Sequence, residues 1–256
     1  MLRAILVLIF AILQIATAGF TQVTGMGISV QERAEAVRTV LTPAGYAFAI
    51  WGVIYLTNFA LALYQVLPGQ WHQTHWRSAG WWLILAYASN SLWQIIVPLN
   101  GITLVSAALI FVLVFASLNA TRALQSELVT YGSWQRALII SPVALLAGWA
   151  AAASVAGFPS ALVNDGIVTS AAFREPYVAA GVLLAAFLVL ARALVAAQGA
   201  LAIGAAGAWA LIAIIVQNRS NPDWPVYLSA LIALFIFGLA LLVTILKNGA
   251  LGRART

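Results

Sequence analysis

One stretch of the sequence, from Pro43 to Tyr55, opens an apolar segment with aromatic side chains at helical spacing. Carboxamides continue the pattern, so one helix face would carry Phe48, Trp51, Tyr55, Asn58, Ala62 and Gln65. These positions recur about every 3.6 residues, the period of an α-helix. Indole and phenol rings stack on flat conjugated molecules, and a carboxamide can hold one polar group. Acyl chains do not require such a face, so we expect it to meet a cavity or another helix.

A second polar face follows in the next apolar segment. It carries Tyr87, Asn90, Trp93 and Gln94, of which Tyr87, Asn90 and Gln94 are spaced i, i+3 and i+7. An unpaired polar group at membrane depth is costly, so each side chain must bond to a neighbouring helix or to a ligand. Bonds between helices would explain any one of these residues. Taken together with the tryptophans of both segments, they favour a pocket.

The composition defines the elements that would position these faces. The chain is 64% hydrophobic and 7% charged, with a mean hydropathy of +1.01. A membrane-spanning helix needs about 20 apolar residues. We therefore predict an all-α integral membrane protein, a bundle of about eight transmembrane helices without a soluble domain. The predicted spans are Ala4 to Gly19, Tyr46 to Val66, Ala79 to Pro98, Ile102 to Leu118, Ala137 to Gly157, Tyr177 to Val195, Ala200 to Val216 and Pro225 to Leu246.

Three segments outside the best-defined spans carry their own predictions. The first 18 residues have the parts of a signal peptide, so whether they form a span or are cleaved is open. Charges interleaved with alanine and valine over Gln31 to Val40 predict a short surface helix that covers a pocket. A second loop is expected from Phe158 to Glu175, with turn chemistry at 164–166.

The basic residues predict the orientation. In an eight-span arrangement, the side that holds both termini carries eight lysines and arginines and the other side carries four. We therefore expect a multi-pass protein of the cell membrane with both termini cytoplasmic. The basic pI of about 10.2 then reflects topology and anionic headgroups. No basic cluster is dense enough for a phosphate-binding patch, so nucleic acid is not an expected partner.

Metal chemistry has little support in the sequence. There is no cysteine, and both histidines, His72 and His75, fall in one loop between tryptophans. Imidazole suits zinc and tetrapyrrole iron. However, tryptophans at this position are typical of an interfacial aromatic belt, which is the favoured interpretation. We predict no metal site.

The two polar faces resemble the tryptophan-rich sensory protein family (TspO/MBR), whose mitochondrial members are the translocator or peripheral benzodiazepine receptor proteins. Tyr46, Phe48 and the Trp51–Tyr55 pair after Pro43 look like its second helix, and Asn90-Ser-Leu-Trp93 looks like its third. Further along, Pro142, Trp149 and Ala153 look like residues of its fifth helix.

The resemblance implies a five-helix membrane unit over residues 1–157, extended by three further helices and a short cytoplasmic tail over residues 158–256. It also implies an intramembrane pocket for a flat hydrophobic ligand, either a tetrapyrrole such as a porphyrin or a sterol-like molecule, in a sensory, regulatory or ligand-handling role. No cofactor would be required, although a bound haem-like tetrapyrrole would fit. The residues expected to contact the ligand are Phe48, Trp51, Tyr55, Asn58, Tyr87, Asn90, Trp93, Gln94 and Trp149.

Other functions have weaker sequence support. No acidic residue lies inside a predicted span, and no catalytic set can be assembled there, so we do not predict an enzyme. Light-dependent porphyrin breakdown is implied by the resemblance only. A transporter or permease of a small amphipathic solute is the alternative, although the spans hold no carboxylate that could couple protons. Small residues at 204–208 would permit a homodimer or close packing within one chain.

Overall fold

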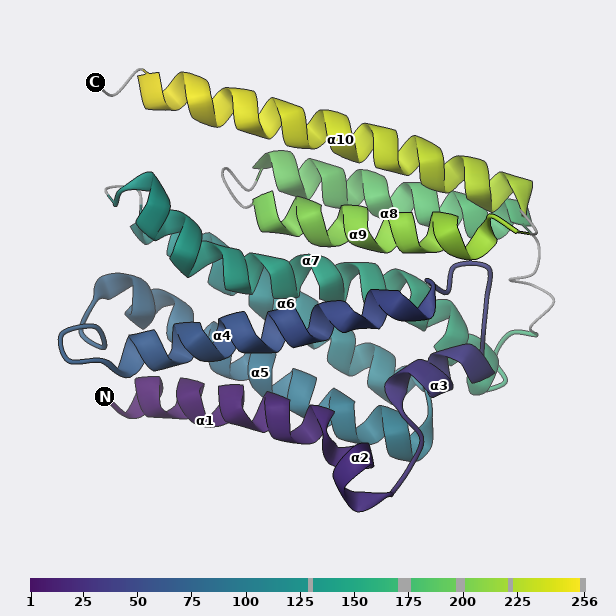
Figure 1. Cartoon of the computed structure of the whole chain (residues 1–256), viewed down its shortest axis with the longest axis horizontal. Helices are drawn as coiled ribbons and strands as arrows, with labels where there is room; N and C mark the ends of the chain where they lie inside the picture. Colours follow the sequence, from purple (N-terminus) through teal and green to yellow (C-terminus); the bar gives the residue numbers. More distant parts are fainter. Residues whose placement is uncertain (129–130, 170–175, 197–200, 221–222, 254–256) are drawn as a thin grey trace.

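A computed structural model describes residues 1–128, 131–169, 176–196, 201–220 and 223–253, and every regular element in these ranges is a helix (Figure 1). The membrane-spanning fold class is therefore confirmed as all-helical. The helices are α1 (Leu2–Ala18), α2 (Phe20–Thr24), α3 (Val30–Ala36), the 3₁₀ helix η1 (Gly45–Ala49), α4 (Ile50–Val66), α5 (Thr74–Asn100), α6 (Leu104–Glu127), α7 (Ser133–Asn164), α8 (Pro176–Ala196), α9 (Leu201–Asn218) and α10 (Trp224–Arg253).

Each of the eight predicted spans falls on one of these helices. Six helical segments in the described ranges are long and apolar enough to cross a membrane: 45–66, 74–100, 104–127, 134–164, 201–218 and 224–246. The two others, in α1 and α8, are shorter apolar helices. The first span after the long loop starts as the 3₁₀ turn η1 and continues as α4, so Phe48 precedes the α-helix that carries Trp51.

Five helices form a closed ring. Helix α1 packs against α4 and α5, α5 packs against α6, α6 against α7, and α7 against α4. The aromatic and polar stripe predicted for α4 faces the interior of the molecule, because Trp51, Tyr55, Asn58 and Gln65 are all buried. Helical periodicity thus correctly identified the inward face.

The last three helices form a layer on one side of this ring (Figure 1). Helix α9 packs on α7, and α8 and α10 pack on each other. Gly148 permits the α7–α9 contact, since a Cβ atom there would lie 2.6 Å from the carbonyl oxygen of Ile203. Gly207 similarly faces the ring of Phe237 on α10. Small residues of α9 therefore pack within one chain, and a homodimer stays a prediction.

The segment between α1 and α4 closes one end of the ring. Helix α3 begins at a capping box, in which Ser29 Oγ accepts from the Glu32 N–H and Glu32 Oε2 accepts from the Ser29 N–H. Arg33 then donates to the carbonyl oxygen of Pro98 at the end of α5, at 2.7 Å. The helix predicted over residues 31–40 therefore exists in its first part and ends at Ala36.

Helix α7 continues beyond the predicted span. It passes Gly157, the expected end of the five-helix unit, and ends at Asn164, so the expected loop from Phe158 was wrong in its first part. Pro159 lies inside this helix although it lacks an N–H, so the carbonyl oxygen of Val155, four residues earlier, has no helical donor. The helix ends at the predicted turn, where Gly166 has a φ of +71°.

Candidate ligand-binding site

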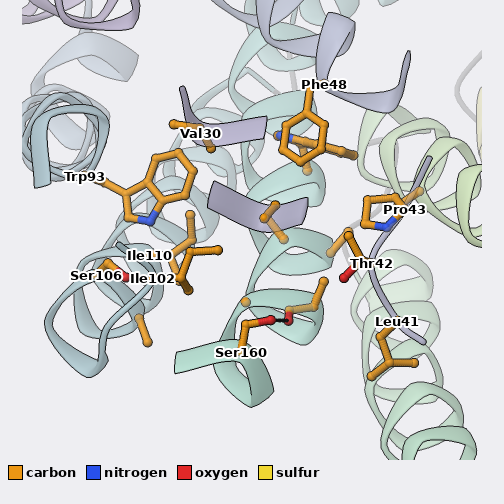
Figure 2. A pocket seen from close by; sticks show the side chains of 18 of the residues that line it. Val30, Leu41, Thr42, Pro43, Phe48, Trp93, Ile102, Ser106, Ile110 and Ser160 are labelled. Atoms are coloured by element: carbon orange, nitrogen blue, oxygen red, sulfur yellow. Dashed lines mark hydrogen bonds between the residues drawn. The ribbon is translucent and has the colours of Figure 1, made fainter. Parts of the chain in front are cut away.

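A cavity of about 770 Å³, counted out to its mouth, lies inside the ring beneath the α3 segment. Figure 2 shows Trp93, Ile102, Ser106 and Ile110 on one side of it and Phe48, Pro43, Thr42 and Leu41 on the other, with Val30 between them. Its wall is almost entirely apolar. The remaining lining residues are Ala34, Trp51, Ala107, Trp149, Ala152, Ala153, Ala156, Gly157, Ser160, Ala210 and Ile214.

Three aromatic rings contact Trp51, which lines this cavity. Tyr55 stacks on Trp51 with ring centroids 5.3 Å apart and an interplanar angle of 17°. Trp93 of α5 lies at 6.0 Å, and Trp149 of α7 lies edge-on at 6.2 Å. Phe48 meets Trp149 edge-on at 6.4 Å. The predicted aromatic residues of α4, α5 and α7, together with Phe48 of η1, are therefore brought together at one place.

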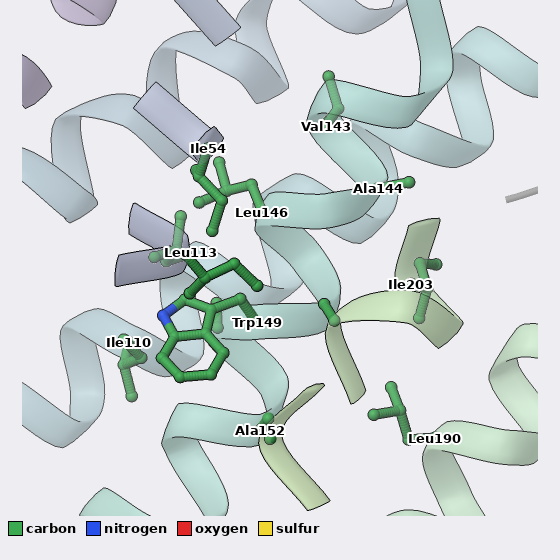
Figure 3. Close-up of a cluster of buried hydrophobic side chains, with 14 of the residues drawn as sticks. Ile54, Ile110, Leu113, Val143, Ala144, Leu146, Trp149, Ala152, Leu190 and Ile203 are labelled. Carbon is green, nitrogen blue, oxygen red and sulfur yellow. The ribbon is translucent and has the colours of Figure 1, made fainter. Parts of the chain in front are cut away.

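Trp149 fixes one wall of the cavity. Figure 3 shows its indole among Ile110 and Leu113 of α6 and Leu146 and Ala152 of α7. Its Nε1–H group is buried without a hydrogen-bond partner among the described residues, and the same holds for Trp51. Both rings line the cavity, but the two nitrogen atoms are themselves fully buried, so neither donor faces the open space.

A second, more polar cavity of about 660 Å³ adjoins the first, and Val30, Phe48 and Trp51 line both. Tyr55 and Gln94 line this second cavity, together with Thr21, Ser29 and Gln31 of the outer segment. Gln94 Nε2–H donates to the Tyr55 hydroxyl oxygen. Trp51 therefore lines both an apolar cavity and a more polar one.

The other three predicted site residues, Asn58, Tyr87 and Asn90, line neither cavity. Tyr87 donates to Asn58 Oδ1 at 2.8 Å, and Asn58 Nδ2 donates to the Pro142 oxygen of α7 at 3.0 Å. Asn90 Nδ2 donates to Gln14 Oε1 of α1 at 2.7 Å. These residues connect helices of the ring, and their contact with a ligand stays a prediction.

Sequence reasoning missed the place of α9 in the cavity wall and the bond by which Gln14 holds Asn90. Gln14 is buried, and the only signal for it was a lone carboxamide in an apolar run. Ala210 and Ile214 of α9 line the cavity, although α9 comes more than 100 residues after the first aromatic stripe. Apolar residues of this kind give no sequence signal that distinguishes a cavity wall from a helix contact.

Neither histidine lines these cavities. His72 lies in the loop before α5, whereas His75, predicted in the same loop, lies in the first turn of α5. His75 is buried against Trp76 and Tyr131, with ring centroids 4.6 and 5.5 Å apart, whereas His72 is exposed. Within the described ranges, no group of three or more His, Asp or Glu side chains could hold a metal ion.

A comparison with known families gives the class of the protein. The TSPO-like protein family matches the chain over residues 4–245, which includes the ring and most of the three-helix layer. The chain therefore belongs to the TSPO-like protein family, as the sequence resemblance predicted. It is a multi-pass membrane protein. No curated protein and no solved structure matches it.

Proposed function

We propose that this protein binds a flat hydrophobic ligand, a tetrapyrrole such as a porphyrin or a sterol-like molecule, in the cavity next to Trp51. The observation that carries the proposal is the convergence of Phe48, Trp51, Trp93 and Trp149 on one apolar cavity. Membership of the TSPO-like family supports a ligand-handling or sensory role.

The chemistry of the wall supports the choice of a flat ligand. Aromatic rings interact with a conjugated ring through offset stacking and edge contacts, and the rings around Trp51 already meet one another in both ways. The adjoining polar cavity offers Tyr55 and Gln94 to a polar substituent. An amphipathic ring system could therefore place its flat apolar part in the first cavity and its polar edge in the second.

The test is a titration of the purified protein with protoporphyrin IX, followed through the absorbance of the porphyrin. We expect Trp51→Ala and Trp149→Ala each to weaken binding by about 1 to 3 kcal/mol, because each removes a large aromatic anchor. That loss corresponds to roughly five- to 150-fold in Kd. The matched control is Trp81→Ala, since Trp81 lies on α5 and is 60% exposed.

Two results would contradict the proposal. If the wild type bound neither protoporphyrin IX nor a sterol probe, a transporter of a small amphipathic solute would become the better hypothesis, to be measured as solute flux into proteoliposomes. If all three tryptophan variants lost affinity equally, the effect would reflect general folding instead of recognition.

A further inference from the structure

We propose that α9 latches the segment that covers the cavity, and that the three-helix layer thereby controls how fast the cavity opens. The covering segment, residues 40–47, connects the α3 region to α4. Its Leu41, Thr42 and Pro43 line the cavity, opposite Trp93 (Figure 2). Movement of these three residues away from the cavity would open it on this side.

Three hydrogen bonds hold the covering segment on α9. Trp209 Nε1–H donates to the Ala47 oxygen at 3.0 Å, and Asn218 Nδ2–H donates to the Val40 oxygen at 3.2 Å. Between them, the Ala44 N–H donates to the Ala213 oxygen at 3.1 Å. The bonds therefore engage both ends and the middle of the covering segment.

Side-chain packing supports the same attachment. Tyr46 meets Trp209 edge-on, with ring centroids 5.4 Å apart and an interplanar angle of 86°. Ala210 and Ile214 lie on α9 between the latching residues and form part of the cavity wall. One face of α9 thus contacts both the covering segment and the cavity.

The other attachments of the outer segment lie before residue 40. Arg33 bonds to the Pro98 oxygen, and Ser160 Oγ donates to the Val37 oxygen at 3.3 Å. Among the described residues, every hydrogen bond from residues 40–47 to another membrane-spanning helix goes to α9. The covering segment can therefore separate from α9 while α3 stays in place.

The experiment measures this opening without a ligand. The chain has no cysteine, so Leu41→Cys introduces a single thiol. Leu41 is 1% exposed, and a soluble maleimide can reach the thiol only when the covering segment opens. Against this background, we expect Trp209→Phe and Asn218→Leu each to raise the labelling rate about three- to tenfold, the effect of losing one hydrogen bond.

Two matched controls define the outcome. Asn119→Leu removes a carboxamide of α6 that, among the described residues, bonds to its own helix alone, through Nδ2 to the Phe115 oxygen. Trp224→Phe changes a tryptophan of α10 that is 60% exposed. Faster labelling in the latch variants and unchanged labelling in the controls would support the proposal. Equal labelling rates in the two latch variants and the two controls would overturn it. Trp209→Phe is the most specific variant, because it removes the hydrogen bond and keeps an aromatic ring against Tyr46.

The consequence for binding rests on the proposed function. If the cavity holds protoporphyrin IX, the same latch variants should release it faster by a similar factor. A wild type that binds no porphyrin would contradict the proposed function, whereas the labelling rates would still decide whether α9 is a latch. Each hypothesis can therefore be contradicted without contradicting the other.

Discussion

Individual side chains in this ring divide between two tasks. Trp51, Trp93 and Trp149 line the cavity, whereas Asn58 and Tyr87 use their polar groups to join α4, α5 and α7. Both groups lie on the same predicted helix faces. Periodicity identifies which face turns inward, but it does not say whether the inward side chain meets a void or another helix. The sequence therefore indicated which side chains turn inward. It could not separate those that line the cavity from those that join the helices.

The bond between Tyr87 and Asn58 leads to the first prediction at this scale. Tyr87→Phe should lower the free energy of unfolding by about 1 kcal/mol, since it leaves the buried Asn58 oxygen without its donor. Thermal unfolding in detergent would measure the loss. In Asn58→Leu, the same tyrosine substitution should cost less, because the partner is already gone.

The same variant also tests the predicted ligand contact of Tyr87. Because Tyr87 does not line either cavity, Tyr87→Phe should leave the Kd for protoporphyrin IX nearly unchanged. A tenfold weaker Kd with unchanged stability would instead place the hydroxyl in contact with the ligand.

The sequence predicted the presence of the membrane helices more accurately than the residues at which they end. Apolar runs located the eight helices of the predicted spans, α1 and α4 to α10, and the turn at Gly166 was recognised from its sequence. The end of α7 was missed because Pro159 normally terminates a helix, whereas here the helix continues to Asn164. The packing of α9 on α7 was also not predictable, since small residues permit close approach without specifying a partner.

Gly148 allows a direct test of the α7–α9 contact. Gly148→Ala should destabilise the protein by about 1 to 3 kcal/mol, because the new Cβ would lie 2.6 Å from a backbone oxygen that cannot easily move. The control is Gly157→Ala on the same helix, where a Cβ would meet nothing within 4 Å. It should be neutral or stabilising by about 0.4–1 kcal/mol. Equal unfolding temperatures for the two variants would contradict the close contact.

The capping box of α3 leads to a pH-dependent prediction. Hydrogen bonds from the Ser29 hydroxyl and N–H lower the pKa of Glu32 below its usual value of about 4.3. The charged carboxylate therefore stabilises the first turn at neutral pH, and this stabilisation is lost as the pH falls through the lowered pKa.

Hydrogen exchange over residues 30–37 would measure this effect. At neutral pH, Glu32→Gln should exchange faster than the wild type, because a charge-assisted bond is replaced by a neutral one. The ratio of the two rates should approach one below the Glu32 pKa. A ratio that does not change with pH would show that the Glu32 charge does not stabilise α3.

The whole molecule places the start of α1 and the end of α10 at the same end of the bundle (Figure 1). That arrangement fits the even number of crossings predicted from the sequence. The first turns of α1, α5 and α7, which carry Arg3, Arg77 and Arg136, lie at this end (Figure 1). Helix α3, which carries Glu32, and the end of α7, just before Asp165, lie at the opposite end. Since basic residues favour the cytoplasm, the end that holds α1's first residue should be cytoplasmic.

Reporter fusions test this orientation. A reporter attached after Arg255 should show cytoplasmic activity, because the eight predicted crossings would return the chain to the side on which it began. A matched fusion after Gly166, in the turn that follows α7, should report the opposite side of the membrane, since five predicted crossings precede it. A periplasmic signal at Arg255 together with a cytoplasmic signal at Gly166 would invert the molecule. The covering segment, residues 40–47, would then face the cytoplasm. The basic residues would not have set the topology.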